Sequence, residues 1–165
     1  MGTVEIPTGK LDEGLALCAE NIRRLARDVD VLLQDSSIAH ATVFAIIASE
    51  ELAKYSELRK VKRSATADSV PVNEFLFRGR EAHQLKQDLA KRLIPEHADV
   101  LAPAAFDRNH FDPESFHTED TEVSNQLRLD CLFVNWDKKG GKWVHGAVIE
   151  ADSLRKFVQD VLDAL

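Results

Sequence analysis

Two short groups of charged side chains carry most of the chemistry that this sequence offers. Glu50, Glu51 and Lys54 follow a stretch that is apolar on all sides of a predicted helix, and His83 and Lys86 lie three residues apart on a later one. Carboxylates beside a buried helical turn need hydrogen-bond donors, and a histidine can transfer protons near neutral pH. If the two groups meet in space, they form a polar cluster that either performs acid–base chemistry or holds helices together.

Each group also has a purely structural interpretation. Glu50 and Lys54 have the four-residue spacing of an exposed ion pair, which contributes about 0.3–0.5 kcal/mol. A partly buried Glu51 needs a donor, and three candidates of the right kind are Lys54, Lys86 and Arg78. In this interpretation His83 is a hydrogen-bonded structural histidine in the cluster with Glu51.

Other residues that could carry chemistry are poorly placed for it. Cys18 and Cys131 are far apart and suit two reduced thiols better than a disulfide framework or a zinc site. Glu114 and His117 have the three-residue step of a di-iron helix bundle, but no second such pair occurs. We therefore expect no metal and no cofactor.

The elements that must position these groups begin with a helical hairpin over 11–63. Apolar residues at alternating steps of four and three predict a first helix from Leu11 to Gln34. Asp35–Ser37 offers a turn and N-cap hydroxyls for a second helix, roughly Ile38 to Arg63. This second helix is apolar all round for two turns, so we expect it to be the central, buried element.

The rest of the chain predicts shorter elements. A polar linker over 64–71 precedes a third helix over 72–94, which Pro95 ends. An irregular loop over 95–117 and a short helix over about 118–128 follow, and alternating residues with a glycine turn predict a β-hairpin over 129–149. The last helix covers 150–165. Trp136 and Trp143 near the hairpin lysines form either a small basic aromatic surface or ordinary hairpin packing.

Size and charge narrow the class of protein. The chain has 165 residues, which suits a single domain over 1–165, and a formal net charge of -7. An acidic chain has no overall attraction for nucleic acid phosphates or anionic membranes, so any contact with RNA needs a local site. With no secretory signal at its start and no apolar stretch of membrane-spanning length, we expect a cytoplasmic protein without a membrane partner.

The chain resembles a known family in several of these segments. The run from Leu15 to Lys60 resembles the helical hairpin of the AbiV family of bacterial abortive-infection proteins, in which a glutamate pair is followed closely by lysine on an alanine-rich helix. His83 and Lys86, and the strand-like run over 128–135, also have counterparts in that family. The matching residues of the hairpin are Asn21, Leu25, Asp28, Leu32, Leu33, His40, Ala41, Ala48, Glu50, Glu51 and Lys54.

AbiV proteins are similar in turn to the HEPN superfamily, and this similarity implies a fold and a chemistry. The implied fold is an all-α, HEPN-like bundle of four to five helices with one β-hairpin before the last helix, assembled as a homodimer. Many members are metal-independent RNases with an arginine followed by a histidine, a spacing that Arg78 and His83 match. Arg92 and His97 match it as well, and with eleven arginines and six histidines about one match is expected by chance. Gly79 stands where RNase members often have a polar residue.

The resemblance implies a role in phage defence by abortive infection, with two competing mechanisms. In the first, the domain is a binding module that captures a phage or host protein, and the polar cluster is architectural. In the second, it is an endoribonuclease in which His83 is the general acid or base and Arg78 stabilises the charge on the phosphate. A third interpretation, a sensor of a nucleotide or signal in the same place, stays open.

Overall fold

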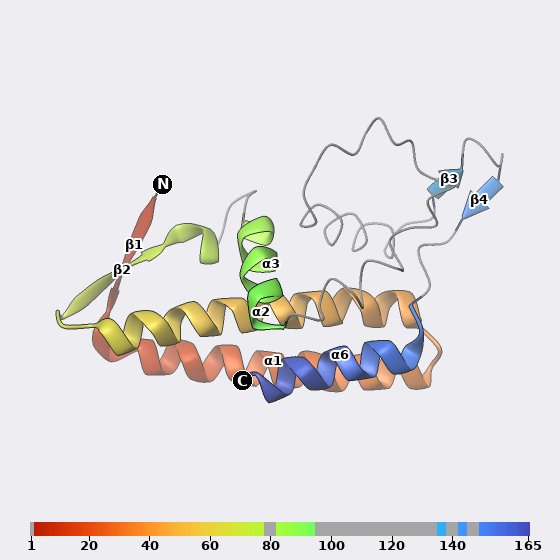
Figure 1. Ribbon diagram of the computed structural model, residues 1–165, viewed down its shortest axis with the longest axis horizontal. Coiled ribbons are helices and arrows are strands. Elements are labelled where there is room, and N and C mark those ends of the chain that lie inside the picture. The colour runs from red at the N-terminus through yellow and green to blue at the C-terminus, as the bar shows by residue number, and fades with distance from the viewer. Residues whose placement is uncertain (1, 78–81, 95–134, 138–141, 145–148) are drawn as a thin grey trace.

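The computed structural model describes the chain over 2–77, 82–94, 135–137, 142–144 and 149–165. These residues contain four α-helices, two short 3-10 helices and two small antiparallel sheets. Figure 1 shows two long antiparallel helices side by side, with the C-terminal helix along them and a shorter helix crossing α2. The mostly helical architecture is therefore confirmed, while the all-α description omits a second sheet that the sequence analysis did not predict.

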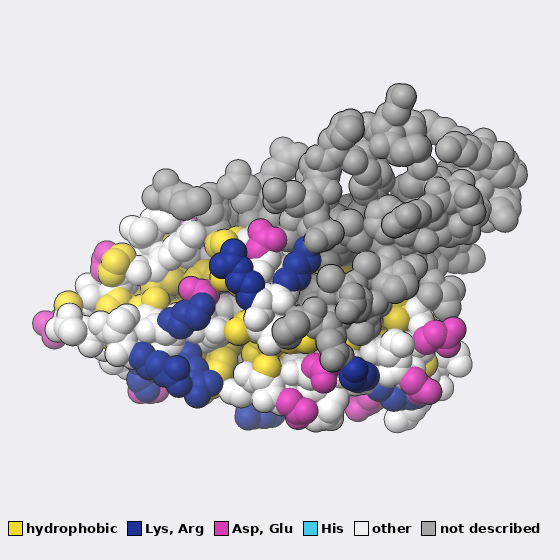
Figure 2. All heavy atoms as spheres, viewed as in Figure 1, with side chains coloured by type: hydrophobic (Ala, Val, Ile, Leu, Met, Phe, Trp, Pro, Cys, Tyr) yellow, Lys and Arg dark blue, Asp and Glu magenta, His cyan; other side chains and the backbone are white. Residues whose placement is uncertain are grey.

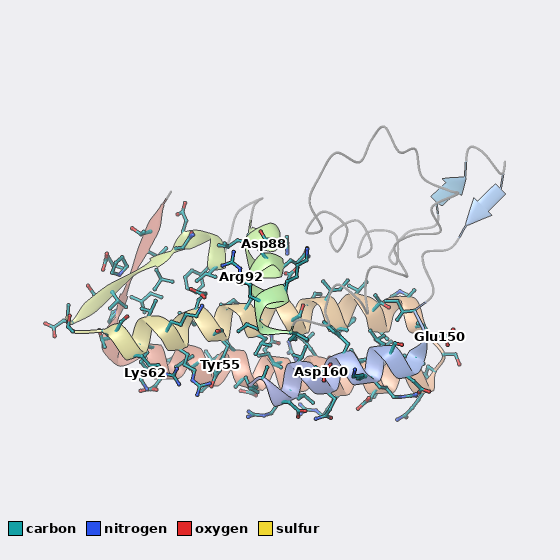
Figure 3. All side chains as sticks on the ribbon, in the orientation of Figure 1. Tyr55, Lys62, Asp88, Arg92, Glu150 and Asp160 are labelled. Atoms are coloured by element: carbon teal, nitrogen blue, oxygen red, sulfur yellow. The ribbon has the colours of Figure 1, made fainter. Side chains whose placement is uncertain are left out.

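The helical hairpin consists of α1, Leu11–Gln34, and α2, Ile38–Ser64. Asp12 at the start of α1 contacts Lys62 near the end of α2, which is consistent with antiparallel helices in register (Lys62 is labelled in Figure 3). The side of α1 that faces α2 follows the predicted apolar stripe. Its buried residues are Leu11, Cys18, Ile22, Leu25, Ala26, Val29 and Leu33.

The turn between the helices is set by backbone geometry rather than by the expected capping hydroxyl. Ser36 has a φ of 58°, the left-handed conformation that ends many helices. The Ser37 N–H bonds to the Leu32 carbonyl at 2.7 Å and the Ser36 N–H to the Leu33 carbonyl at 3.2 Å, the pattern of a Schellman motif. Ser37 is the N-cap residue of α2, but its hydroxyl contacts His40 Nδ1 instead of the helix backbone.

The central position of α2 is confirmed, because this helix contacts α1, α3, α6 and β2. Small residues at Ala41, Ala45 and Ala48 are completely buried, which lets the neighbouring helices approach closely. Buried hydroxyls on α2 are satisfied within the helix, since Thr42 donates to the Ile38 carbonyl and Ser49 donates to the Ile46 carbonyl.

The predicted third helix over 72–94 is wrong over its first residues, 72–76. The strand β2, Ser69–Asn73, and a 3-10 turn, Glu74–Leu76, come first, and α3 spans Ala82–Leu93. In β2 the buried residues Val70 and Val72 alternate with exposed neighbours, which is the period of a strand and not of a helix. The end of α3 agrees with the effect expected of Pro95.

The sheet at the hairpin's open end pairs β2 with β1, Thr3–Pro7, an element that was not predicted. In the antiparallel register Val4 lies opposite Val72, and Ile6 lies opposite Val70. The sheet covers a second apolar cluster at this end of the molecule, formed by Leu11, Cys18, Leu58, Val70, Val72 and Leu76.

Two apolar clusters therefore lie along one hairpin, and two elements connect them. The larger cluster is formed by the middle of α1 and α2 together with α6, and Tyr55 of α2, labelled in Figure 3, packs against both clusters. Helix α3 also reaches both: Leu85 and Leu89 pack on the smaller cluster, whereas Leu93 and Ile94 belong with the larger one.

The C-terminal region follows the predicted order as far as it is described. Strands β3, Asn135–Asp137, and β4, Lys142–Val144, form an antiparallel pair in which Trp136 lies opposite Trp143. The loop over 95–117, the short helix over 118–128 and the rest of the hairpin region lie outside the described residues.

The last helix, α6, spans Ala151–Asp163 and packs on both α1 and α2. It buries one face completely: Leu154, Phe157 and Val161 each have 0% exposed surface. On the face shown in Figure 2, acidic and basic side chains are interspersed, with apolar strips between them. Within the described ranges, no helix combines the length and the apolar character needed to cross a membrane.

Candidate functional site

The centre of the site is Glu50, a carboxylate that is 2% exposed in the middle of α2. Three side chains of α3 approach it. Gln87 Nε2 donates to Oε1 at 2.8 Å, His83 Nδ1 lies 2.7 Å from Oε2, and Lys86 Nζ lies 3.5 Å from the same oxygen. Because an ionised carboxylate only accepts hydrogen bonds, Nδ1 is the donor in the His83 contact.

The arrangement follows from helix periodicity. His83 and Gln87 are four residues apart and Lys86 lies between them in sequence, so all three project toward the same side of α3. That side faces the turn of α2 that carries Glu50, where α2 and α3 are in contact. One buried carboxylate thus serves as the common acceptor for one helical turn of donors, and it fixes α3 on the hairpin.

The energetic role of this network differs from that of a surface ion pair. Removing a carboxylate from water carries a large desolvation cost, which is recovered only when several donors with good geometry surround it. Glu50 has hydrogen bonds to His83 and Gln87, and the Lys86 ammonium, on a residue that is only 8% exposed, lies 3.5 Å from it as an ion-pair partner. The Gln87 amide is completely buried, and its Oε1 has no hydrogen-bond partner among the described residues. The site therefore contains both a satisfied acid and an unused acceptor.

Glu51 and Lys54 form a separate pair. Lys54 Nζ lies 2.5 Å from Glu51 Oε1, and the two side chains are 19% and 13% exposed. The expected Glu50–Lys54 pair and the expected contact of His83 with Glu51 are thus both incorrect. The reason is a rotation of about 100° per helical residue, which places consecutive glutamates on different sides of α2. Glu50 faces α3, whereas Glu51 lies close enough to Cys18 on α1 to influence its ionisation.

Of the two residues proposed for catalysis, the structure describes only His83. Its side chain is 41% exposed although its ring is held by a buried carboxylate. Arg78 lies outside the described residues, as do His97, Glu114 and His117. Asp88 and Arg92, labelled on α3 in Figure 3, are exposed. Among the described residues, no group of three or more potential metal ligands occurs.

Gln87 is the member of the site that the sequence analysis missed. A signal was present, because Gln87 lies one helical turn after His83 and shares its side of the helix. An uncharged amide is rarely singled out as a candidate site residue from sequence, yet here Gln87 donates a 2.8 Å hydrogen bond to the buried Glu50.

Cys18 provides a test of how tightly α1 and α2 pack beside this region. Burial raises the pKa of the Cys18 thiol, Glu51 raises it further and Lys54 opposes the shift. In a Cys131→Ser background, we expect native Cys18 to react with iodoacetamide at about pH 8 at least about tenfold more slowly than the urea-unfolded chain. The rate of thiol alkylation measures this directly, and equal rates in the two states would contradict the packing.

The same shift has a consequence for stability with a defined sign. Below the ordinary thiol pKa both the folded and the unfolded chain keep the proton, so the ionisation of Cys18 does not change the free energy of unfolding. As the pH rises through that value the unfolded chain ionises first, and the free energy of unfolding falls. In a Cys18→Ala variant of the same background, we expect this fall in the free energy of unfolding at alkaline pH to be absent.

Comparison with known proteins identifies the family. No curated protein and no solved structure matched the chain, but the HEPN AbiV family model, described as AbiV, matches residues 10–162. The match spans α1, α2, α3 and most of α6, including Glu50 and the three side chains of α3 described around it. The resemblance inferred from the hairpin residues is thereby confirmed: this chain belongs to the AbiV family of HEPN-type abortive-infection domains.

Proposed function

We propose that this chain acts in abortive infection by binding a phage or host component through the side of α3 that carries His83. The observation that supports this most is the Glu50–His83 contact of 2.7 Å. It fixes one edge of an imidazole whose side chain is nevertheless 41% exposed. A side chain held rigid before binding loses little entropy when a partner arrives, which is typical of residues that dominate an interface.

A second candidate function, metal-independent cleavage of RNA, is favoured by the same contact. A carboxylate that accepts from Nδ1 sets the orientation of the ring, as required of a histidine that moves a proton at Nε2. Arg78 is the proposed partner, with the guanidinium stabilising charge on the phosphate. In a homodimer, which the family resemblance implies, two such histidines would face one substrate.

The experiment uses two substitutions of His83 and one control. His83→Asn keeps a donor near the position of Nδ1, and so keeps a bond to Glu50, but it removes Nε2. His83→Ala removes both. The control is Asp88→Ala, because Asp88 is an exposed residue of the same helix on a different side.

We expect both His83 variants to lose protection against phage by at least about tenfold, the effect of losing one dominant contact residue. Asp88→Ala will protect as the wild type does. The measurement is plaque formation on cells that carry each variant, with protein amounts compared by immunoblot. Full protection by His83→Asn would end both candidate functions at this residue.

Incubation of purified protein with RNA in EDTA separates the two candidates. If wild-type protein cleaves RNA and His83→Asn lowers the rate by about 10²–10⁴, the nuclease is supported. If wild-type protein leaves RNA intact while His83→Asn still loses protection, the binding function is supported and the nuclease is rejected.

A further inference from the structure

A groove of about 660 Å³ lies between α1 and α6, on elements that take no part in the Glu50 network. It is lined along α1 by residues at positions 23, 26, 27 and 30, and along α6 by residues at positions 155, 158, 159 and 162. Each set has the spacing i, i+3, i+4 and i+7, the ridge that one helix presents to another. Two such ridges side by side leave room for a third helix.

The floor and the rim of the groove differ in chemistry. Ala26 and Val158 are each 5% exposed and form an apolar floor that Leu162 extends. The polar lining residues Arg23 and Arg155 are exposed at its edges. An apolar floor with a polar, solvent-accessible rim is the anatomy of a protein interface, whereas a small-molecule pocket gathers its polar groups inside.

The charge of the rim selects the partner. Arg23 and Arg27 have no ion-pair partner among the described residues, whereas Arg155 contacts Asp152 at 2.7 Å. Asp30 also lines the groove, so the two unpaired guanidinium groups of Arg23 and Arg27 stand beside one lining carboxylate. On a chain whose formal net charge is -7, this is a local excess of positive charge. It complements carboxylates and repels lysines.

We propose that this groove binds an amphipathic helix of a partner protein, with its apolar side on the floor and acidic residues against Arg23 and Arg27. The mode is the packing of a helix into a preformed groove. The surface is separate from the His83 side of α3, so the proposal does not depend on the function proposed there.

The test uses two synthetic helical peptides that share the same leucines at i, i+3, i+4 and i+7. One carries glutamates on both flanks of the leucine stripe, and the other carries lysines. Binding to the full chain is measured by fluorescence anisotropy. We expect the acidic peptide to bind, the lysine peptide to bind at least about tenfold more weakly, and the acidic peptide's affinity to fall with added salt.

Matched charge reversals locate the binding. The double substitution Arg23→Glu and Arg27→Glu will weaken binding of the acidic peptide by about tenfold or more. The single substitution Arg24→Glu will leave the affinity unchanged. Arg24 is the proper control because it is an exposed neighbour on the same helix that does not line the groove and bonds instead to Asn21. Circular dichroism will check that all variants stay helical.

Three results would overturn the proposal. The first is failure of the acidic peptide to bind, and the second is an equal loss in the Arg24→Glu variant. The third is self-association of the wild-type chain that the double reversal abolishes and the peptide cannot compete with, because the occupant would then be a second copy. None of these outcomes bears on His83, since the reversals leave α2 and α3 unchanged.

Discussion

Glu50→Ala will lower the free energy of unfolding by about 3–5 kcal/mol, because it leaves Lys86 buried without its carboxylate and Gln87 without its acceptor. The measurement is urea denaturation followed by circular dichroism. The slope of the transition should stay constant, so that the shift in midpoint reports stability alone. This is the largest effect that we expect from a single polar substitution in the described part of the chain.

Glu57→Ala is the matched control. Glu57 lies on the same helix and pairs with Lys60, whose side chain is 62% exposed. Removing an exposed pair of this kind costs less than about 1 kcal/mol. Similar losses in the two variants would show that Glu50 does not fix α3 on the hairpin. For Glu50→Gln, which keeps the shape of the side chain and removes its charge, the loss in free energy of unfolding should lie between those of the two alanine variants.

Phe157→Ala will cost a similar amount, about 3–5 kcal/mol, for an apolar reason. Among the described residues, Phe157 is the largest completely buried side chain, and it lies in the cluster that α6 forms with α1 and α2. Truncation leaves a cavity that the surrounding helices fill only in part. Urea denaturation will measure the loss, and hydrogen exchange will show faster amide exchange in α6 than in α1.

The control for this cavity is Val31→Ala on the outer side of α1. Val31 is 57% exposed, so its truncation should change stability by no more than about 0.5 kcal/mol. If Phe157→Ala unfolds at the same urea concentration as Val31→Ala, then α6 contributes little to the stability of the hairpin.

The elements predicted well are those whose signal is long and local. The stripe on α1 repeats over 24 residues, and the all-round apolar turns of α2 indicated the central helix that the structure contains. The β1–β2 sheet was missed because its pairing joins residues such as Thr3 and Asn73, far apart in the sequence. Each strand has five residues, too few to establish a period, and β2 contains Pro71, which is uncommon inside strands.

The candidate site was predictable in its residue types but not in its pairing. The types of Glu50, His83 and Lys86 marked them as a possible group before any geometry was known. Which of the adjacent glutamates is buried depends on where α3 docks around α2, and docking is decided by contacts between distant segments. The sequence pattern favoured Glu51 as the buried glutamate, because a helical wheel shows only the apolar neighbours on α2 itself.

The two apolar clusters give the molecule two places at which local opening can begin. The sheet end can separate from the smaller cluster while the α6 end stays closed, and the reverse also holds, because each cluster has its own set of buried side chains. Helix α3 rests on both clusters and is pinned to α2 by Glu50 at the junction. Helix α3 therefore detaches only when both clusters open together, so the surface around His83 stays folded during local opening of either end.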